Sequence, residues 1–207
     1  VVKAANGDVT KNSDYTGTIN FKISPTPKAY LKTTSIKIKW TPVVSATEYR
    51  IYRAEYNTST KKYGSYKRVK TLFGDAKEWS DKNVTSGKKY KYCVKAVNGK
   101  VVCEKKVANT LYFLTKPTVS LTKAKTGVKV SWTAVKGASK YRVYRSELQN
   151  GEWSKFTEIA TFDSKTKSYT DTMVSSGIQY KYKVKAVKSS TGQTSTETTA
   201  FLYLEAP

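Results

Sequence analysis

Hydrophobic and polar residues alternate in short runs along the chain, and no run has the spacing of an amphipathic helix. In residues 36–40, Ile36, Ile38 and Trp40 alternate with two lysines, and residues 90–97 follow a similar pattern. Since successive side chains of a strand point to opposite faces, the apolar set is predicted to face a core and the lysines to face away. Glycine, asparagine, serine and proline separate the runs and favour turns. The pattern predicts an all-β fold.

The pattern occurs twice. Trp40 aligns with Trp132 at an offset of 92 residues, and Tyr49–Arg53 aligns with Tyr141–Arg145 at the same offset. Farther along, residues 87–97 align with residues 177–187 at an offset of 90. A period of about 90 residues is too long for a solenoid repeat and is typical of a small complete domain. About seven strands per period predict two tandem seven-stranded Ig-like β-sandwiches.

The repeat predicts the domain boundaries. Residues 25–115 are expected to form module 1 and residues 116–207 to form module 2. Residues 1–24 are expected to be a remnant F–G hairpin of a preceding module, or a linker, because Val2–Gly7 resembles Val94–Gly99. At the other end, Phe201–Pro207 resembles Leu111–Pro117. We expect the chain to be part of a longer array.

Several of the repeated motifs resemble those of the fibronectin type III family. They are a Trp that ends the second strand, a Tyr-x-Ile/Val-Tyr-Arg third strand, and Gly-x-x-Tyr-x-Tyr-x-Val-x-Ala in the sixth. The resemblance is strongest to the bacterial modules of secreted enzymes and surface proteins, and it covers roughly residues 25–207. It implies a tyrosine corner at Tyr90 and Tyr180, where the phenol bonds to the backbone upstream. It also implies an extracellular role as a spacer, an adhesion unit or a carbohydrate-binding accessory, although the fold does not decide among these.

The two cysteines lie on either side of a predicted turn at residues 97–100. A type I turn with Gly99 in a left-handed bulge places Cys93 opposite Cys103, whereas a type I′ turn on Asn98-Gly99 places Cys93 opposite Glu104. We predict a Cys93–Cys103 disulfide, which would indicate an extracellular compartment. The alternative is a pair of free, partly exposed thiols. Module 2 has Lys183 at the position of Cys93.

Positive charge dominates the composition. The chain carries 38 Lys and Arg against 15 Asp and Glu, a net charge of +23. Alternation places basic and aromatic side chains together on one outward sheet face of each module: Arg50, Tyr52, Lys91 and Lys95 in module 1, and Arg142, Tyr144, Lys181, Lys183 and Lys185 in module 2. Such a face could bind an anionic polymer such as teichoic acid, an acidic polysaccharide or a mucin glycan. The alternative is an ordinary solvated face whose lysines discourage association between sheets.

Aromatic residues also gather after the third strand of each module, namely Tyr56, Tyr63, Tyr66, Trp153 and Phe156. Trp153 follows the Asn150-Gly151 turn signal, so it is the best candidate for an exposed ring that stacks on a sugar. The alternative is that these rings close the edge of the sandwich, which the pattern favours. Trp40, Trp132 and Trp79 are predicted core residues.

The composition argues against catalysis. The chain has no histidine and only two cysteines, so it lacks the commonest general base and a four-thiolate zinc site. Asp81 and Asp171 recur at equivalent positions, where a carboxylate that accepts from turn amides is the usual reason. We predict no enzyme activity, no metal site and no cofactor.

The same features indicate which partners to expect and which to exclude. Nucleic acid is not expected, since only five of the 38 cations are Arg. No apolar run approaches the roughly 20 residues of a membrane-spanning helix. The predicted function is a spacer or interaction region of a larger bacterial surface or secreted protein, with other domains of the same polypeptide as neighbours. The alternative is an adhesion module that binds a cell-wall polymer, a polysaccharide or a glycoprotein.

Overall fold

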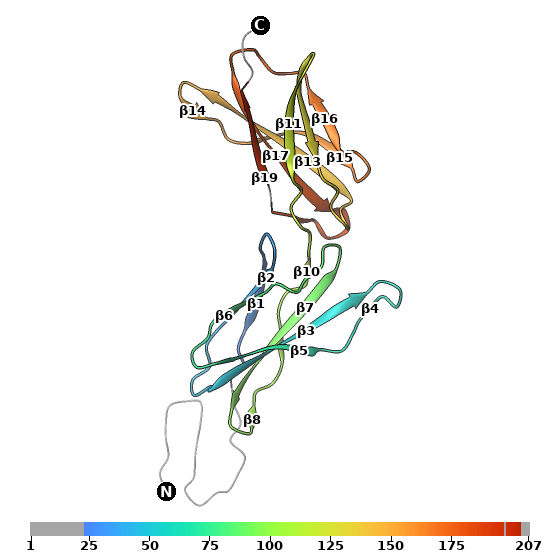
Figure 1. Cartoon of the computed structure of the whole chain (residues 1–207). Coiled ribbons are helices and arrows are strands. Elements are labelled where there is room, and N and C mark those ends of the chain that lie inside the picture. Colours follow the sequence, from blue (N-terminus) through green and yellow to red (C-terminus); the bar gives the residue numbers. More distant parts are fainter. Residues whose placement is uncertain (1–22, 197, 204–207) are drawn as a thin grey trace, which may run out of the picture. The chain divides into compact units, whose positions relative to one another are not determined.

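The computed structural model describes residues 23–196 and 198–203 (Figure 1). The hairpin expected in residues 1–24 lies almost entirely outside the described residues. The chain forms two compact units: the first ends at Leu111, and the second begins at Tyr112 and also includes the short segment Thr85–Lys88. Each unit is described by itself.

Module 1 consists of two antiparallel sheets. The three-stranded sheet has the order β1-β2-β6, and the other sheet has β7 and β3 at its centre, with β4 and β5 on one side of β3 and β8, β9 and β10 beside β7. The strands are β1 (Pro27–Leu31), β2 (Ile36–Trp40), β3 (Glu48–Asn57), β4 (Lys62–Tyr63), β5 (Lys67–Phe73), β6 (Glu78–Asp81), β7 (Lys89–Asn98), β8 (Val101–Val102), β9 (Lys106–Val107) and β10 (Leu111–Tyr112).

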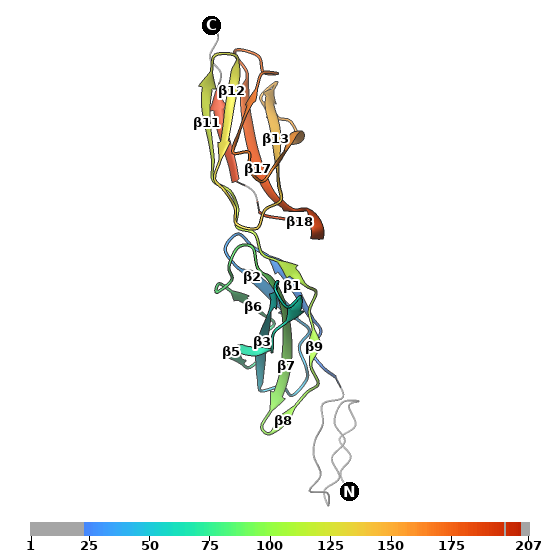
Figure 2. The same ribbon diagram turned by 90° about the vertical axis from the view of Figure 1, so that its right-hand side faces the viewer.

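Module 2 repeats this arrangement, and Figure 2 shows β11 and β12 in one layer and β13 and β17 in the other. Its three-stranded sheet has the order β11-β12-β16, and β13 and β17 form the centre of the second sheet. The elements are β11 (Val119–Ala124), β12 (Gly127–Trp132), β13 (Lys140–Gln149), β14 (Glu152–Trp153), β15 (Thr157–Asp163), β16 (Ser168–Asp171), β17 (Gln179–Lys188), the 3₁₀ turn η1 (Ser189–Thr191), β18 (Gln193–Thr194) and β19 (Thr198–Tyr203).

The predicted all-β class is confirmed. In each module two of the seven expected strands are broken into shorter ones. In module 1, β4 and β5 follow one another along β3, and β8 to β10 follow one another along β7. In module 2, β14 and β15 follow one another along β13, and β18 and β19 along β17. A register shift between Ile51 and Tyr52 marks a bulge where β5 pairs with β3, and module 2 has the same shift between Val143 and Tyr144. With the interrupted strands counted once, each module is a seven-stranded sandwich with a three-stranded and a four-stranded sheet.

The core consists of the inward residues that the alternation predicted. Ile36, Ile38 and Ile51 have no exposed surface, and Trp40 is 5% exposed. Trp79, which was also expected in the core, lies at the margin and is only half-buried because β6 is an edge strand. In module 2 the corresponding cluster includes Val128, Val130, Trp132, Val143, Tyr182 and Val184.

Buried tyrosines bind backbone groups in both modules. The amide of Val43 donates to the Tyr49 hydroxyl at 2.7 Å, and the amide of Val135 donates to Tyr141 at 2.8 Å. The tyrosine corner implied by the resemblance is present at Tyr180, whose hydroxyl accepts from the amide of Ser175 at 2.8 Å. Each bond satisfies a loop amide and fixes the position of the loop against the core.

Candidate functional site

A buried carboxylate in module 1 forms the most tightly bonded polar cluster. Asp81 is 1% exposed, and its Oδ1 accepts from the turn amide of Asn83 at 2.9 Å. Its Oδ2 accepts from Arg53 Nη1 at 2.8 Å and from the Tyr92 hydroxyl at 2.9 Å. Burial and the neighbouring carboxylate raise the pKa of Tyr92 far above its usual range, so this hydroxyl stays protonated and keeps donating.

Module 2 has the same cluster. Asp171 Oδ1 accepts from the amide of Met173 at 3.1 Å, and Oδ2 accepts from Arg145 Nη1 at 3.0 Å and from Tyr182 at 2.9 Å. The predicted bond to a turn amide is therefore confirmed for both aspartates. The arginine and tyrosine partners were not predicted, because they lie on other strands. Both carboxylate oxygens are used in holding three strands together, so the clusters have a structural role.

The candidate ligand residues lie on the outer faces, by which we mean the faces of the β3/β7 and β13/β17 sheets that point away from the core. On β3 and β7, Arg50 lies opposite Lys95 and Tyr52 opposite Cys93. On β13 and β17, Arg142 lies opposite Lys185, Tyr144 opposite Lys183, and Ser146 opposite Lys181. The structure therefore brings the predicted set of each module together on one face.

One arginine of each face has an acidic neighbour. Arg50 Nε lies 2.5 Å from Glu48 Oε1, and Arg142 Nε lies 3.9 Å from Glu158 Oε2. Because a nearby carboxylate offsets much of the field of an arginine, these two arginines contribute less to the positive potential of each face than their formal charge suggests.

In module 2 the lysine ammonium groups lie over aromatic rings. Lys181 Nζ is 3.8 Å from the centroid of Trp153, and Lys183 Nζ is 4.2 Å from that of Phe156 and 5.3 Å from that of Tyr144. Lys185 Nζ is 5.5 Å from the Tyr144 centroid. These distances are within the range of cation–π attraction, which holds each ammonium against a ring. We call Lys181, Lys183 and Lys185 the ring-held lysines of module 2.

Module 1 has ring-held lysines too, at Lys89, Lys91 and Lys105. Lys91 Nζ is 4.4 Å from the Tyr63 centroid and Lys89 Nζ is 4.8 Å from the Tyr56 centroid. Lys105 Nζ is 4.5 Å from the centroid of Tyr66. Lys105 was missed by the sequence analysis, because its place depends on the register of the segment between β8 and β9.

A small residue on the central strand permits one of these contacts in each module. Ala54 lies opposite Lys91 on β3 and β7, and Ser146 lies opposite Lys181 on β13 and β17. Both small residues are only 1% exposed although they belong to the outer face. Since a larger side chain would stand between the lysine and the ring, their size lets Lys91 reach Tyr63 and Lys181 reach Trp153.

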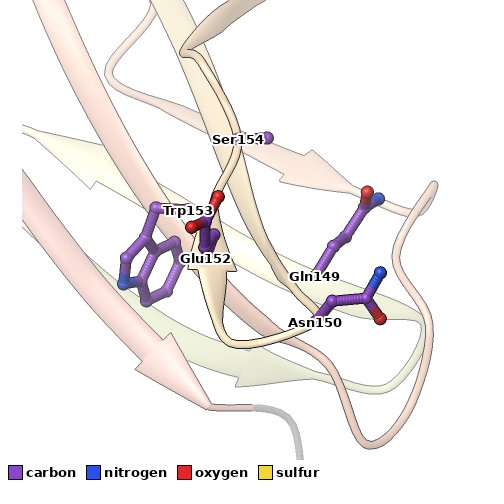
Figure 3. Close-up of a pocket in the computed structure, with 5 residues that line it drawn as sticks. All are labelled: Gln149, Asn150, Glu152, Trp153 and Ser154. Carbon is purple, nitrogen blue, oxygen red and sulfur yellow. The ribbon is translucent and has the colours of Figure 1, made fainter.

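Trp153 lies on the β13–β14 hairpin. Leu148 pairs with Trp153 and Gln149 with Glu152, and the turn residues Asn150 and Gly151 have φ of 50° and 81°. Figure 3 shows the indole on one side of this hairpin and Gln149 and Asn150 on the other, around a shallow hollow. The indole is half-buried and one of its faces lies under Lys181, so it has the packed arrangement rather than that of a fully exposed ring.

The predicted disulfide is absent: Cys93 and Cys103 are free and buried. The hairpin turns on Gly99-Lys100, since Asn98 pairs with Val101, and neither expected register occurs. Cys103 instead lies beside Ala96, whose carbonyl accepts from the Cys103 amide at 3.0 Å, and Cys93 pairs with Val107. The two cysteines are therefore offset along the strand pair, and the inference of an oxidising compartment from a bridge loses its support.

Cys103 has the structural role that Ser195 has in module 2. Its Sγ accepts from the Ala96 amide at 2.9 Å, as Ser195 Oγ accepts from the Ala186 amide at 3.0 Å. We expect Cys103→Ser to change the free energy of unfolding of module 1 by less than about 0.5 kcal/mol. Cys103→Ala should cost about 1–2 kcal/mol, because it leaves the buried Ala96 amide without an acceptor. Urea titration of both variants checks this, and equal stability of the two variants would contradict it.

Cys93 should be chemically inert in the folded chain. Burial raises the pKa of its thiol to about 11, although Lys105 and Lys95 oppose the rise. We expect slow alkylation at pH 8, because little of the thiol is ionised and the sulfur is covered. In denaturant without reductant, intact mass should show two alkyl groups added. Addition of none under those conditions would show that the cysteines are bridged after all.

Comparison with known proteins identifies the family. Residues 117–200 match a family model described as the fibronectin type III domain, SaeA third domain. Module 2 is a fibronectin type III domain. Module 1 has the same strand order, the same aspartate cluster and the same motif residues, so the chain carries two tandem fibronectin type III-like modules. No curated protein matches the chain.

Solved structures of tandem and single modules are similar to this chain. A two-domain fibronectin type III segment of chicken tenascin is 17% identical, with a TM-score of 0.48, and the match covers 87% of this chain and 99% of that one. The FN1–FN3 domains of chicken CNTN1 are 17% identical over 96% of this chain and 74% of that one, with a TM-score of 0.39. An Fn3-like protein from Clostridium thermocellum is 22% identical over 42% of this chain and 91% of that one, with a TM-score of 0.34.

The described residues contain no group of three or more His, Cys, Asp or Glu side chains that could hold a metal ion. Among the same residues, no helix is long and apolar enough to cross a bilayer.

Proposed function

We propose that the chain is a non-catalytic, extracellular spacer and interaction region of a larger bacterial surface or secreted protein. Fibronectin type III domains are typically non-catalytic and commonly extracellular. The observation that carries the proposal is the repetition of the aspartate cluster, with Asp81 and Asp171 each bound by an arginine, a tyrosine and a turn amide. The polar groups that converge in these modules hold strands together instead of facing a cleft.

The extracellular part of the proposal can be tested in the source organism. Antibodies against this chain should label intact cells or detect the protein in the culture medium. Permeabilised cells are the control for total protein. Labelling that occurs only after permeabilisation would contradict an extracellular spacer.

The ring-held lysines favour a second function, the binding of an anionic polymer such as a cell-wall polymer, a polysaccharide or a glycoprotein. Six ammonium groups lie over rings on the outer faces, and Arg50 and Arg142 each lie beside a glutamate. Fixed ammonium groups give up less side-chain entropy when a ligand binds. This supports charge-driven binding over stacking of a sugar on Trp153, whose one face is covered by Lys181.

Retention on immobilised polysaccharide, mucin and cell-wall preparations tests this second function. We expect retention that disappears at high salt, because screening weakens contacts between exposed charges. Retention that survives high salt and is lost in Trp153→Ala would show ring stacking instead. An absence of retention on every matrix would overturn the second function and leave the spacer function as it stands.

A further inference from the structure

In both modules an ammonium group lies over an equivalent ring, but the lysine that supplies it comes from a different strand position. Tyr66 and Phe156 correspond at an offset of 90 residues. Lys183 of β17 covers Phe156, but its counterpart in module 1 is Cys93, and Lys105 from the segment between β8 and β9 covers Tyr66 instead. The centroid distances are similar, 4.5 Å in module 1 and 4.2 Å in module 2. The ring and its ammonium are thus present in both modules although the lysine comes from different strands.

The lysines of module 2 form a row. Lys181, Lys183 and Lys185 occupy alternate positions of β17, so their Cα atoms are spaced by about 6.6–6.8 Å along one face. Each ammonium lies over a ring, and about 0.5–1 kcal/mol per contact favours this arrangement before a ligand arrives. A straight row of single positive charges matches a linear polymer that carries single negative charges.

The type of cation indicates the type of anion. Lysine meets phosphate as a point charge, whereas planar two-point recognition of an anion uses the guanidinium fork of arginine. On these faces Arg50 Nε lies 2.5 Å from Glu48 and Arg142 Nε lies 3.9 Å from Glu158, whereas the cations held over rings are lysines. This favours a polymer with tetrahedral, singly charged groups, which is the chemistry of phosphodiesters.

The rings argue against nucleic acid as that polymer. Proteins that bind single strands offer ring faces on which bases stack. Here lysine ammonium groups cover one face of the Trp153, Phe156 and Tyr66 rings. A phosphodiester polymer without bases needs no ring face and can bind the ammonium groups directly.

We infer that the outer face of each module binds a linear, base-free phosphodiester polymer, through Lys91 and Lys105 in module 1 and Lys181 and Lys183 in module 2. This inference rests on the second function proposed above. It names the polymer class and the contacts.

The test measures binding of the full chain to poly(glycerol phosphate) at several salt concentrations. Two double variants remove the same charge from different parts of module 2. Lys181→Gln/Lys183→Gln changes the outer face, and Lys125→Gln/Lys129→Gln, at exposed positions of β12 and of the turn before it, is the control. We expect the outer-face variant to weaken binding by about tenfold. It should also make the dependence of log K on log salt shallower by about one per lysine removed. The control should bind like the original chain.

A matched pair of single variants tests module 1. Lys105→Gln removes the ammonium over Tyr66, and Lys106→Gln removes an exposed charge one residue away, on a position that pairs with the inward Val94. We expect Lys105→Gln to weaken binding by a few-fold and Lys106→Gln to leave it unchanged. Far-ultraviolet circular dichroism should be the same for both variants, since both lysines are outside the core.

Each other outcome overturns the inference in a distinct way. Equal losses in the outer-face variants and their controls would show binding to net charge and no site. Equal or tighter binding of single-stranded DNA would assign the faces to nucleic acid, and equal binding of dextran sulfate would remove the preference for phosphodiesters. Retention on cell-wall matrices without binding of poly(glycerol phosphate) would reject the inference while keeping the second function.

Discussion

Replacing Asp171 by alanine is expected to lower the free energy of unfolding of module 2 by about 2–4 kcal/mol. The carboxylate is 1% exposed, and its removal leaves the buried Tyr182 hydroxyl and the Met173 amide without their acceptor. Arg145 loses one carboxylate partner and keeps the other, Glu147 at 2.6 Å. Calorimetry of the full chain should show the loss in the transition of module 2. Asp81→Ala should have an effect of similar size on module 1, because the cluster there is the same.

Asp163→Ala is the matched control for that experiment. Asp163 also accepts from two backbone amides, those of Lys165 and Thr166, but it is exposed and binds no arginine. We expect a much smaller loss of stability than for Asp171→Ala. Equal losses in the two variants would show that turn capping, and not the buried cluster, is the main contribution of Asp171.

The second large effect is expected at Gly127, where β12 begins beside Asp171. Gly127 has φ of +140°, and a Cβ there would lie 2.0 Å from the Asp171 carbonyl oxygen and 2.9 Å from its carbonyl carbon. The obstacle is backbone, so the strand pair must shift to admit a methyl group. We expect Gly127→Ala to destabilise module 2 by about 3 kcal/mol or more, from backbone strain and overpacking together. Urea unfolding followed by tryptophan fluorescence measures the change.

Gly177→Ala separates the two causes. Gly177 also has a positive φ, +75°, but nothing lies within 4 Å of the position of its Cβ. It should therefore show only the cost of a left-handed residue, about 1–2 kcal/mol. If Gly127→Ala costs no more than Gly177→Ala, the close approach of Gly127 to Asp171 is not a constraint on the fold.

The residues that face the core could be predicted because the alternation within a single strand is enough to identify them. Alternation along Ile36–Trp40 is enough to assign each side chain to a face, since the period of a strand is two residues. The register of the β7–β8 hairpin could not be predicted in this way. Residues 97–100 are compatible with turns on Asn98-Gly99 and on Gly99-Lys100, and the turn that forms separates Cys93 from Cys103.

The sequence predicts which strands and which face carry the candidate ligand residues. It does not predict which side chains those residues contact. Alternation placed Lys181, Lys183 and Lys185 on one face with Tyr144, as the pairing of β13 and β17 has them. The arrangement of ammonium groups over rings depends on side chains from neighbouring strands and on small residues such as Ser146, which no local pattern encodes. Lys105, which reaches Tyr66, lies between β8 and β9, in a segment whose register no local pattern encodes.

The central claim, that lysines of the outer faces are held against aromatic rings, can be tested most directly by NMR spectroscopy of Lys181. Its ammonium lies 3.8 Å from the Trp153 centroid, so the ring current should move the ε-methylene protons of Lys181 upfield of those of the exposed Lys125. In Trp153→Ala the Lys181 signal should return to the position of an exposed lysine. A Lys181 signal that already coincides with that of Lys125 in the unmodified chain would contradict the account.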